Sequence, residues 1–128
     1  MQLLASGLAV ARLGMATARD LRRLALALEG TSEAPHFDRA AFKVATIYVT
    51  LAADGKTANF KFSAEEQELR CSLQPRAFAP VAGGWGAMGY TTGTLAALSV
   101  GELEDALRTA WGQAQRKPRK RAAKRGKG

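Results

Sequence analysis

The sequence contains a single cysteine, Cys71, and a single histidine, His36, among its 128 residues. One cysteine cannot form an intrachain disulfide, and one cysteine with one histidine cannot supply the ligands of the common zinc sites. We therefore expect neither a metal nor another cofactor, and a reducing, cytoplasmic environment. The sequence also lacks an apolar run of the roughly 20 residues that a membrane-spanning helix requires. We expect no membrane span.

Acidic residues are absent from the C-terminal segment 116–128, RKPRKRAAKRGKG, which contains eight basic residues. The whole chain has 19 Lys and Arg, 11 Asp and Glu, and a formal net charge of +8. Residues 1–115 therefore hold eleven residues of each sign, and the entire positive excess lies in the C-terminal segment. So dense a run of like charges cannot form a core, and we interpret it as a basic tail that is disordered in isolation.

A basic tail of this kind favours binding to a polyanion, because each phosphate contact releases condensed counterions. We expect such binding to be non-specific and to weaken steeply with salt. DNA, RNA and acidic lipid are all admissible partners, and a tail that only improves solubility is the competing interpretation. The basic residues concerned are Arg116, Lys117, Arg119, Lys120, Arg121, Lys124, Arg125 and Lys127.

Residues 1–14, MQLLASGLAVARLG, contain an apolar stretch with no Lys or Arg ahead of it. A secretory signal peptide would have such a charged region. We interpret these residues as an N-terminal extension, upstream of a domain that spans 15–115, and a signal peptide is the alternative.

Three segments of the domain combine a helix-capping pair with apolar residues at helical spacing. The capping pairs are Thr17 with Asp20, Ser63 with Glu66, and Ser99 with Glu102. We expect the first helix to end at Gly30 and the short second helix to be anchored by Leu69.

Segments 40–44, 46–51 and 57–62 alternate with a period of two and predict strands. Asp54-Gly55, between the last two, is typical of a type I′ hairpin. Two further strands are expected on either side of the Gly-rich stretch around Trp85, the second from Tyr90 to Leu95. The glycines of that stretch predict a mobile turn and no regular helix.

The resulting order is α-β(3)-α-β(2)-α. Alternating strands with hairpin-length links predict an α+β fold with two layers, in which helices cover one face of a five-stranded antiparallel sheet.

The domain resembles the MmcQ/YjbR family in three stretches. These are EGTSEAPHFDRAAFKV (29–44), NFKFSAEEQ (59–67) and WGAMGYTT (85–92), the last followed by a helix that contains Trp111. The resemblance covers residues 17–115 and is most specific in its first stretch. It implies a two-layer fold similar to the type III secretion chaperone and CyaY-like folds, and it implies the family's label of DNA-binding protein. Many members have Trp where this chain has Tyr90, and the basic tail lies outside the resembling region.

Alternation places Lys43 and Lys61 on the side of their strands opposite the apolar residues. If these strands are neighbours, both lysines stand on the exposed sheet face with Tyr48, Asn59 and Arg39, where a phosphate could dock. Aromatic and basic groups on a sheet face also suit single-stranded nucleic acid. Ordinary surface lysines are the competing interpretation.

The remaining candidates are His36, Trp85 and Tyr90. His36 is followed by Asp38 and could act as an acid or base, but the sequence offers no matched nucleophile, so we expect no catalysis. We interpret His36 as a contact residue of the sheet face. The Gly-rich stretch lacks the Lys and the following helix of a phosphate-binding loop, and we expect it to present Trp85 and Tyr90 at the sheet edge.

The sequence therefore predicts a non-enzymatic protein that binds nucleic acid without sequence specificity, mainly through its tail. The sheet face and the Gly-rich stretch would position the polymer. The alternative is a module for binding a protein or a small ligand, with the tail as an accessory.

Overall fold

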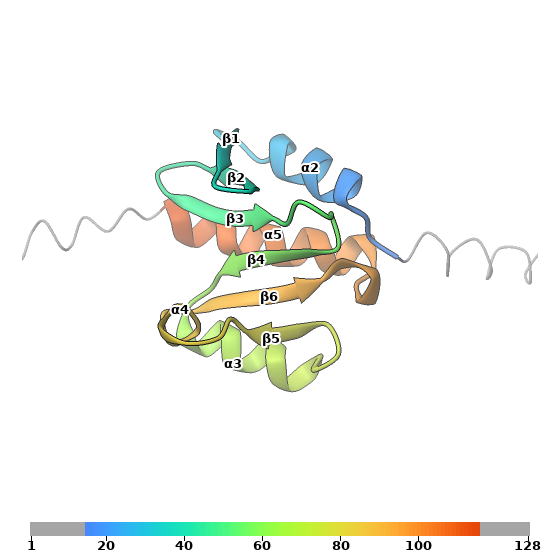
Figure 1. Ribbon diagram of the computed structural model, residues 1–128, viewed down its shortest axis with the longest axis vertical. Coiled ribbons are helices and arrows are strands. Elements are labelled where there is room, and N and C mark those ends of the chain that lie inside the picture. The colour runs from blue at the N-terminus through green and yellow to red at the C-terminus, as the bar shows by residue number, and fades with distance from the viewer. Residues whose placement is uncertain (1–14, 116–128) are drawn as a thin grey trace, which may run out of the picture.

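The computed structural model describes residues 15–115, so the predicted N-terminal extension and basic tail lie outside the described residues. The described residues form an α+β fold (Figure 1). Its elements are α2 (Ala18–Ala27), β1 (Ser32–His36), β2 (Arg39–Lys43), β3 (Ile47–Leu51), β4 (Thr57–Lys61), α3 (Ala64–Leu73), β5 (Phe78–Pro80), α4 (Gly84–Ala87), β6 (Tyr90–Thr94), the 3-10 helix η1 (Leu95–Ala97) and α5 (Val100–Gln115).

The strands form one antiparallel sheet in the order β1-β2-β3-β4-β6-β5. The prediction of an α+β fold with an antiparallel sheet is confirmed, but the predicted count of five strands is wrong because β1 is a sixth. Segment 32–36 contains Pro35 and has no buried residue, so it lacks the alternating apolar pattern of a strand. An edge position tolerates both features, because only one side of an edge strand takes part in the hydrogen-bonded ladder.

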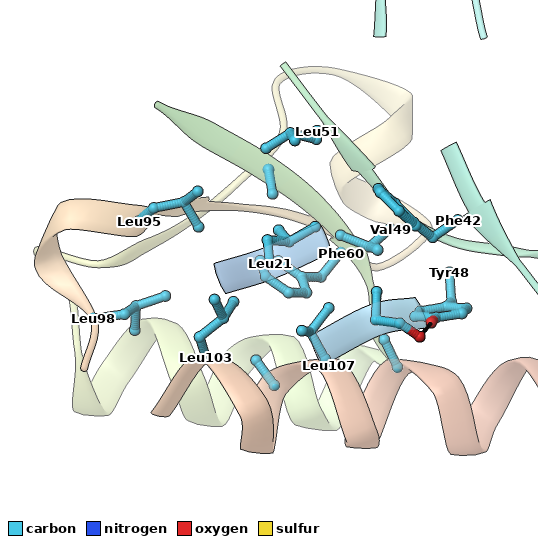
Figure 2. Close-up of a cluster of buried hydrophobic side chains, with 14 of the residues drawn as sticks. Leu21, Phe42, Tyr48, Val49, Leu51, Phe60, Leu95, Leu98, Leu103 and Leu107 are labelled. Carbon is cyan, nitrogen blue, oxygen red and sulfur yellow. Dashed lines mark hydrogen bonds between the residues drawn. The ribbon is translucent and has the colours of Figure 1, made fainter. Parts of the chain in front are cut away.

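The apolar core lies between one face of the sheet and the helices. Val49 of β3 and Phe60 of β4 point from the sheet toward Leu21 of α2 and toward Leu103 and Leu107 of α5 (Figure 2). Four of these five side chains are fully buried, and Val49 is 1 % exposed. In Figure 1, α5 passes behind β3 and β4, while α2 and α3 lie toward opposite edges of the sheet. We call the helix-covered side the inner face and the other side the open face.

The predicted capping pairs begin all three long helices. Thr17 and Asp20 form a reciprocal capping box, and so do Ser99 and Glu102. At α3 only half of the box is present. Ser63 accepts from the backbone N–H of Glu66, whereas the Glu66 carboxylate accepts from Arg70 at 2.8 Å.

Arg70, and not the predicted Leu69, anchors α3. Leu69 is 51 % exposed and α3 has no buried residue, so its expected role as an apolar anchor is wrong. The Arg70 guanidinium lies 5.0 Å from the centre of the Phe62 ring and donates to Asp105 and Thr109 of α5. A stacked cation with several hydrogen bonds thus replaces an apolar contact between this helix and the core.

The link between β3 and β4 is a hairpin, as predicted, but not a two-residue type I′ turn. The backbone N–H of Ala52 donates to Thr57, and that of Gly55 donates to Ala52. Among the residues that link β3 to β4, Gly55 is the one with a left-handed φ, of 73°. A type I′ turn needs positive φ at both central residues, so Asp54, whose φ is not positive, excludes it.

The Gly-rich stretch contains a one-turn helix, α4, so the prediction that it forms no regular helix is wrong. Its backbone is closely packed. A Cβ built on Gly86 would lie 1.9 Å from the Val81 carbonyl oxygen, and one on Gly89 would lie 1.9 Å from the Phe62 carbonyl oxygen. Gly89 also has a φ of 103°. Two of these glycines are therefore required by close backbone packing.

We predict that Gly89→Ala lowers the free energy of unfolding by about 3 kcal/mol or more, because the added methyl group meets a carbonyl oxygen and φ becomes strained. Urea denaturation followed by circular dichroism measures the change. Gly84→Ala is the matched control. No atom lies within 4 Å of its added Cβ, and its stability should stay within about 0.5 kcal/mol of the unaltered protein. Equal stability of the two variants would contradict the packing argument.

Candidate nucleic-acid interface

The open face carries polar side chains in its central rows. Thr50, Asn59 and Thr92 lie side by side on β3, β4 and β6 and are all partly exposed. The Thr92 hydroxyl donates to the Asn59 side-chain oxygen at 2.8 Å. These residues alternate with the buried Val49, Phe60 and Thr91 of the inner face. The sequence prediction that Asn59 and Lys61 point away from the apolar core is confirmed.

The charges of the sheet are separated between its two faces. Arg39, Lys43 and Lys61 belong to the open face, and among the described strands the one acidic residue is Glu33 of β1. Glu33 points to the helix layer, where the Arg22 side chain of α2 donates to both of its carboxylate oxygens. The other carboxylates of residues 15–115 lie on helices, turns and connecting segments. The strands therefore contribute three cations and no carboxylate to the open face.

Lys61, Tyr90 and Trp85 form a cluster at one end of the open face. Lys61 and Tyr90 are direct partners across β4 and β6, and the Lys61 amine lies 5.5 Å from the centre of the Tyr90 ring. The Trp85 ring meets Tyr90 nearly at right angles, with 5.3 Å between ring centres. Trp85 is 60 % exposed. The structure thus brings together three residues that the sequence nominated separately, and we call them the aromatic-basic cluster.

Gln67 of α3 fixes α4 and the start of β6 beneath this cluster. Its side-chain amide donates to the carbonyl oxygens of Gly86 and Tyr90 at 3.0 Å and lies 3.1 Å from the Thr91 hydroxyl. The sequence analysis missed Gln67, because one glutamine on a helix gives no signal of a contact 19 or more residues away.

Lys43 and Arg39 occupy opposite ends of β2. The strands that carry Lys43 and Lys61 are not neighbours, because β3 lies between β2 and β4. Both lysines are nevertheless at the same end of the sheet, and two strand spacings place their backbones about 10 Å apart. Arg39 reaches over β3 and donates to the Thr50 hydroxyl at 2.8 Å and to the Thr50 carbonyl oxygen at 3.2 Å.

Tyr48 does not belong to the open face, which corrects its prediction as a contact residue. It is fully buried among the core side chains (Figure 2). Its hydroxyl lies 2.8 Å from that of Thr31 and donates to the carbonyl oxygen of Ala25. The pairing of β2 with β3 shifts by one residue after Phe42. This bulge lets Tyr48 and Val49 both enter the core, which strict alternation forbids.

His36 ends β1, at the edge of the sheet remote from β6 and its aromatic-basic cluster. Its ring packs edge-on against Phe37, whose φ of 62° and exposure of 91 % place it at the tip of the β1–β2 hairpin. Across residues 15–115, no three side chains of His, Cys, Asp or Glu are grouped so as to hold a metal ion. Burial raises the pKa of the Cys71 thiol, which favours the unreactive protonated form.

No helix within the described range is long and apolar enough to cross a membrane.

Comparison with known proteins identifies a similar fold. No protein-family model and no curated protein matches the sequence. Among solved structures, the crystal structure of the Deinococcus radiodurans protein DR2400, a domain of the DUF419 family model, aligns with a TM-score of 0.69. The two sequences are 23 % identical, and the alignment covers 80 % of this chain and 81 % of the other. At this level of identity the likeness establishes the fold alone.

We predict that Tyr48→Phe lowers the free energy of unfolding by about 1 kcal/mol, the usual contribution of a buried hydrogen bond. The variant should also be less sensitive to alkali. Burial raises the pKa of Tyr48, and the hydrogen bond with Thr31 opposes this only in part. The neutral hydroxyl therefore stabilises the fold fully below the unfolded pKa of about 10, and this stability is lost as pH rises through the folded pKa.

Urea denaturation between pH 8 and pH 11 tests this linkage. The stability difference between the unaltered protein and Tyr48→Phe should shrink as pH rises above about 10. A difference that is constant across this range would show that the hydroxyl does not titrate with folding.

Proposed function

We propose that this chain is a non-enzymatic, cytoplasmic nucleic-acid-binding protein of the MmcQ/YjbR family. In this proposal the basic segment 116–128 supplies most of the affinity, without sequence preference. The open face of the sheet orients the bound polymer.

Two findings support membership of the family. The stretch Glu33-Ala34-Pro35-His36-Phe37 and the sequence Phe42-Lys43-Val44 at the end of β2 resemble the family's most specific motif. The fold is similar to that of DR2400, which is a DUF419 domain, and DUF419 is another name for the YjbR/MmcQ-like family.

The separation of charge in the sheet is the observation that carries the proposal. Residues 1–115 are formally neutral, so they attract a polyanion little at long range. At short range the two sides of the sheet differ, because its strands direct Arg39, Lys43 and Lys61 to the open face and Glu33 to the helix layer. A phosphate backbone that arrives at the domain is therefore favoured on the open face.

The position of the C-terminal end of α5 links the two basic regions. In Figure 1 this end of α5 and α4 lie at the same end of the sheet, where the aromatic-basic cluster is found. The Trp111 indole, one turn before the end of α5, donates to the carbonyl oxygen of Glu29, close to the start of β1. The eight basic residues follow directly in the sequence. The basic segment thus begins at the same end of the sheet as the aromatic-basic cluster but on the helix-covered side, and in this proposal a bound polymer passes around that end to reach the open face.

Deletion of residues 116–128, giving a chain that ends at Gln115, should lower the affinity for generic duplex DNA at 50 mM salt by more than about tenfold. The logarithm of the affinity falls against the logarithm of salt with a slope of about −0.9 for each phosphate contacted. With three open-face cations left, the truncated chain should show a slope no steeper than about −3. Fluorescence anisotropy of a labelled duplex measures both quantities.

An unchanged affinity and slope in the truncated chain would contradict the role of the basic segment. That result would favour the alternative from the sequence, a module for binding a protein or a small ligand.

Removal of the open-face lysines should weaken binding of the full-length chain to every sequence alike. We expect Lys43→Gln and Lys61→Gln each to reduce the steepness of the salt slope by about 1. Arg19→Gln is the matched control, since it removes one exposed cation from α2 in the helix layer. Equal effects of all three substitutions would mean that the polymer has no preferred face of the domain.

A further inference from the structure

We infer that the open face binds single-stranded nucleic acid in preference to duplex, with a base stacked on Trp85. This inference rests on the proposed function. It adds that the nucleic acid is single-stranded and that Trp85 is the residue that distinguishes a single strand from a duplex.

Trp85 is an exposed aromatic side chain on a fixed support. It leaves 60 % of its surface to solvent, although it belongs to a helix whose neighbouring residue Gly86 is buried against the Val81 backbone. The side-chain amide of Gln67, on α3, donates to the carbonyl oxygen of Gly86 and holds this residue in place. A ring that is already positioned loses little conformational freedom when a flat ligand stacks on it.

The neighbours of Trp85 suit a nucleotide. Tyr90 packs against the indole nearly at right angles, and the Lys61 amine lies over the Tyr90 ring. Lys43 lies at the same end of the open face, about 10 Å from Lys61 by strand spacing. An aromatic ring beside a row of cations is the arrangement that single strands use, because a base stacks while its phosphates meet the charges.

The shape of the open face favours a single strand over a duplex. Its central rows hold the short side chains of Thr50, Asn59 and Thr92. The major groove of a duplex admits a helix or a two-stranded ribbon, and α4, the helix that carries Trp85, has only four residues. In a duplex the bases are already stacked on one another, so they do not stack on Trp85. A single strand offers free base faces.

The chain contains two tryptophans, which allows a direct test. In the full-length Trp111→Phe variant, Trp85 is the one remaining tryptophan, and titration with short oligo(dT) or oligo(U) should quench its fluorescence. In Trp85→Phe the remaining Trp111 is partly buried and hydrogen-bonded to Glu29, and it should respond far less. Little quenching of Trp85 during saturable binding of either oligonucleotide would overturn the inference.

Affinity measurements give an independent readout. At a salt concentration that weakens phosphate contacts, the full-length chain should bind oligo(dT) more tightly than a duplex of equal length. Trp85→Ala should lose about tenfold in affinity for oligo(dT), within the range of one stacked base, and change duplex affinity less than about twofold. Trp85→Tyr should retain most of the affinity. Met88→Ala, which alters another exposed residue beside α4, is the matched control and should bind as the unaltered chain does.

The outcomes separate this inference from the proposed function. Binding of both ligands with equal affinity, unaffected by Trp85→Ala, overturns the single-strand preference and leaves the proposed function in place. Failure of the full-length chain to bind any nucleic acid at low salt overturns both. A loss of oligo(dT) affinity that Met88→Ala shares would assign the effect to the fold of α4 and overturn the role of Trp85.

Discussion

Burial of one face of the sheet is the constraint on which the rest of this structure depends. Because successive residues of a strand point to opposite sides, packing Val49 and Phe60 against α5 leaves Thr50, Asn59 and Lys61 on the other side. The polar and charged residues that alternate with buried residues along these strands therefore lie together on one surface. The open face owes its composition to the same alternation that builds the core, and its cations are held in register by backbone pairing.

A second constraint acts where the sheet meets α4. The backbone at Gly86 and Gly89 approaches two carbonyl groups so closely that no side chain fits between them, and Gln67 ties the same segment to α3. This packing uses backbone and amide contacts, so it does not need Trp85 as an apolar anchor. The indole is left at the surface while its helix stays fixed. An exposed aromatic ring on a rigid support differs in this respect from one on a loop, which must be ordered when a ligand binds.

The sequence predicted the order of the long helices, their caps and four of the strand positions, because capping pairs and alternation are local signals. It failed where a distant contact decides the outcome. Tyr48 enters the core because a bulge shifts the register of β3, and no local pattern marks that shift. Arg70 replaces Leu69 as the anchor of α3 because two phenylalanine rings and α5 receive its guanidinium. Alternation along each strand was enough to predict that Lys43 and Lys61 share one side of the sheet. That β3 lies between their strands depends on the order of strands in the sheet, which no local pattern reveals.

The distribution of charge shows how a neutral domain could bind a polyanion, as the proposed function requires. A neutral domain attracts phosphate weakly from a distance, so its few cations cannot recruit the polymer, but they can select which surface it touches once it is near. A dense basic segment has the opposite properties: it attracts any polyanion and specifies no orientation, since eight charges without aromatic residues offer no stacking. The proposed function therefore assigns recruitment and orientation of the polymer to different parts of the chain. Because the two parts are connected through α5, whose last turn lies at the same end of the sheet as the aromatic-basic cluster, the proposal makes contact with the open face intramolecular once the basic segment has bound the polymer.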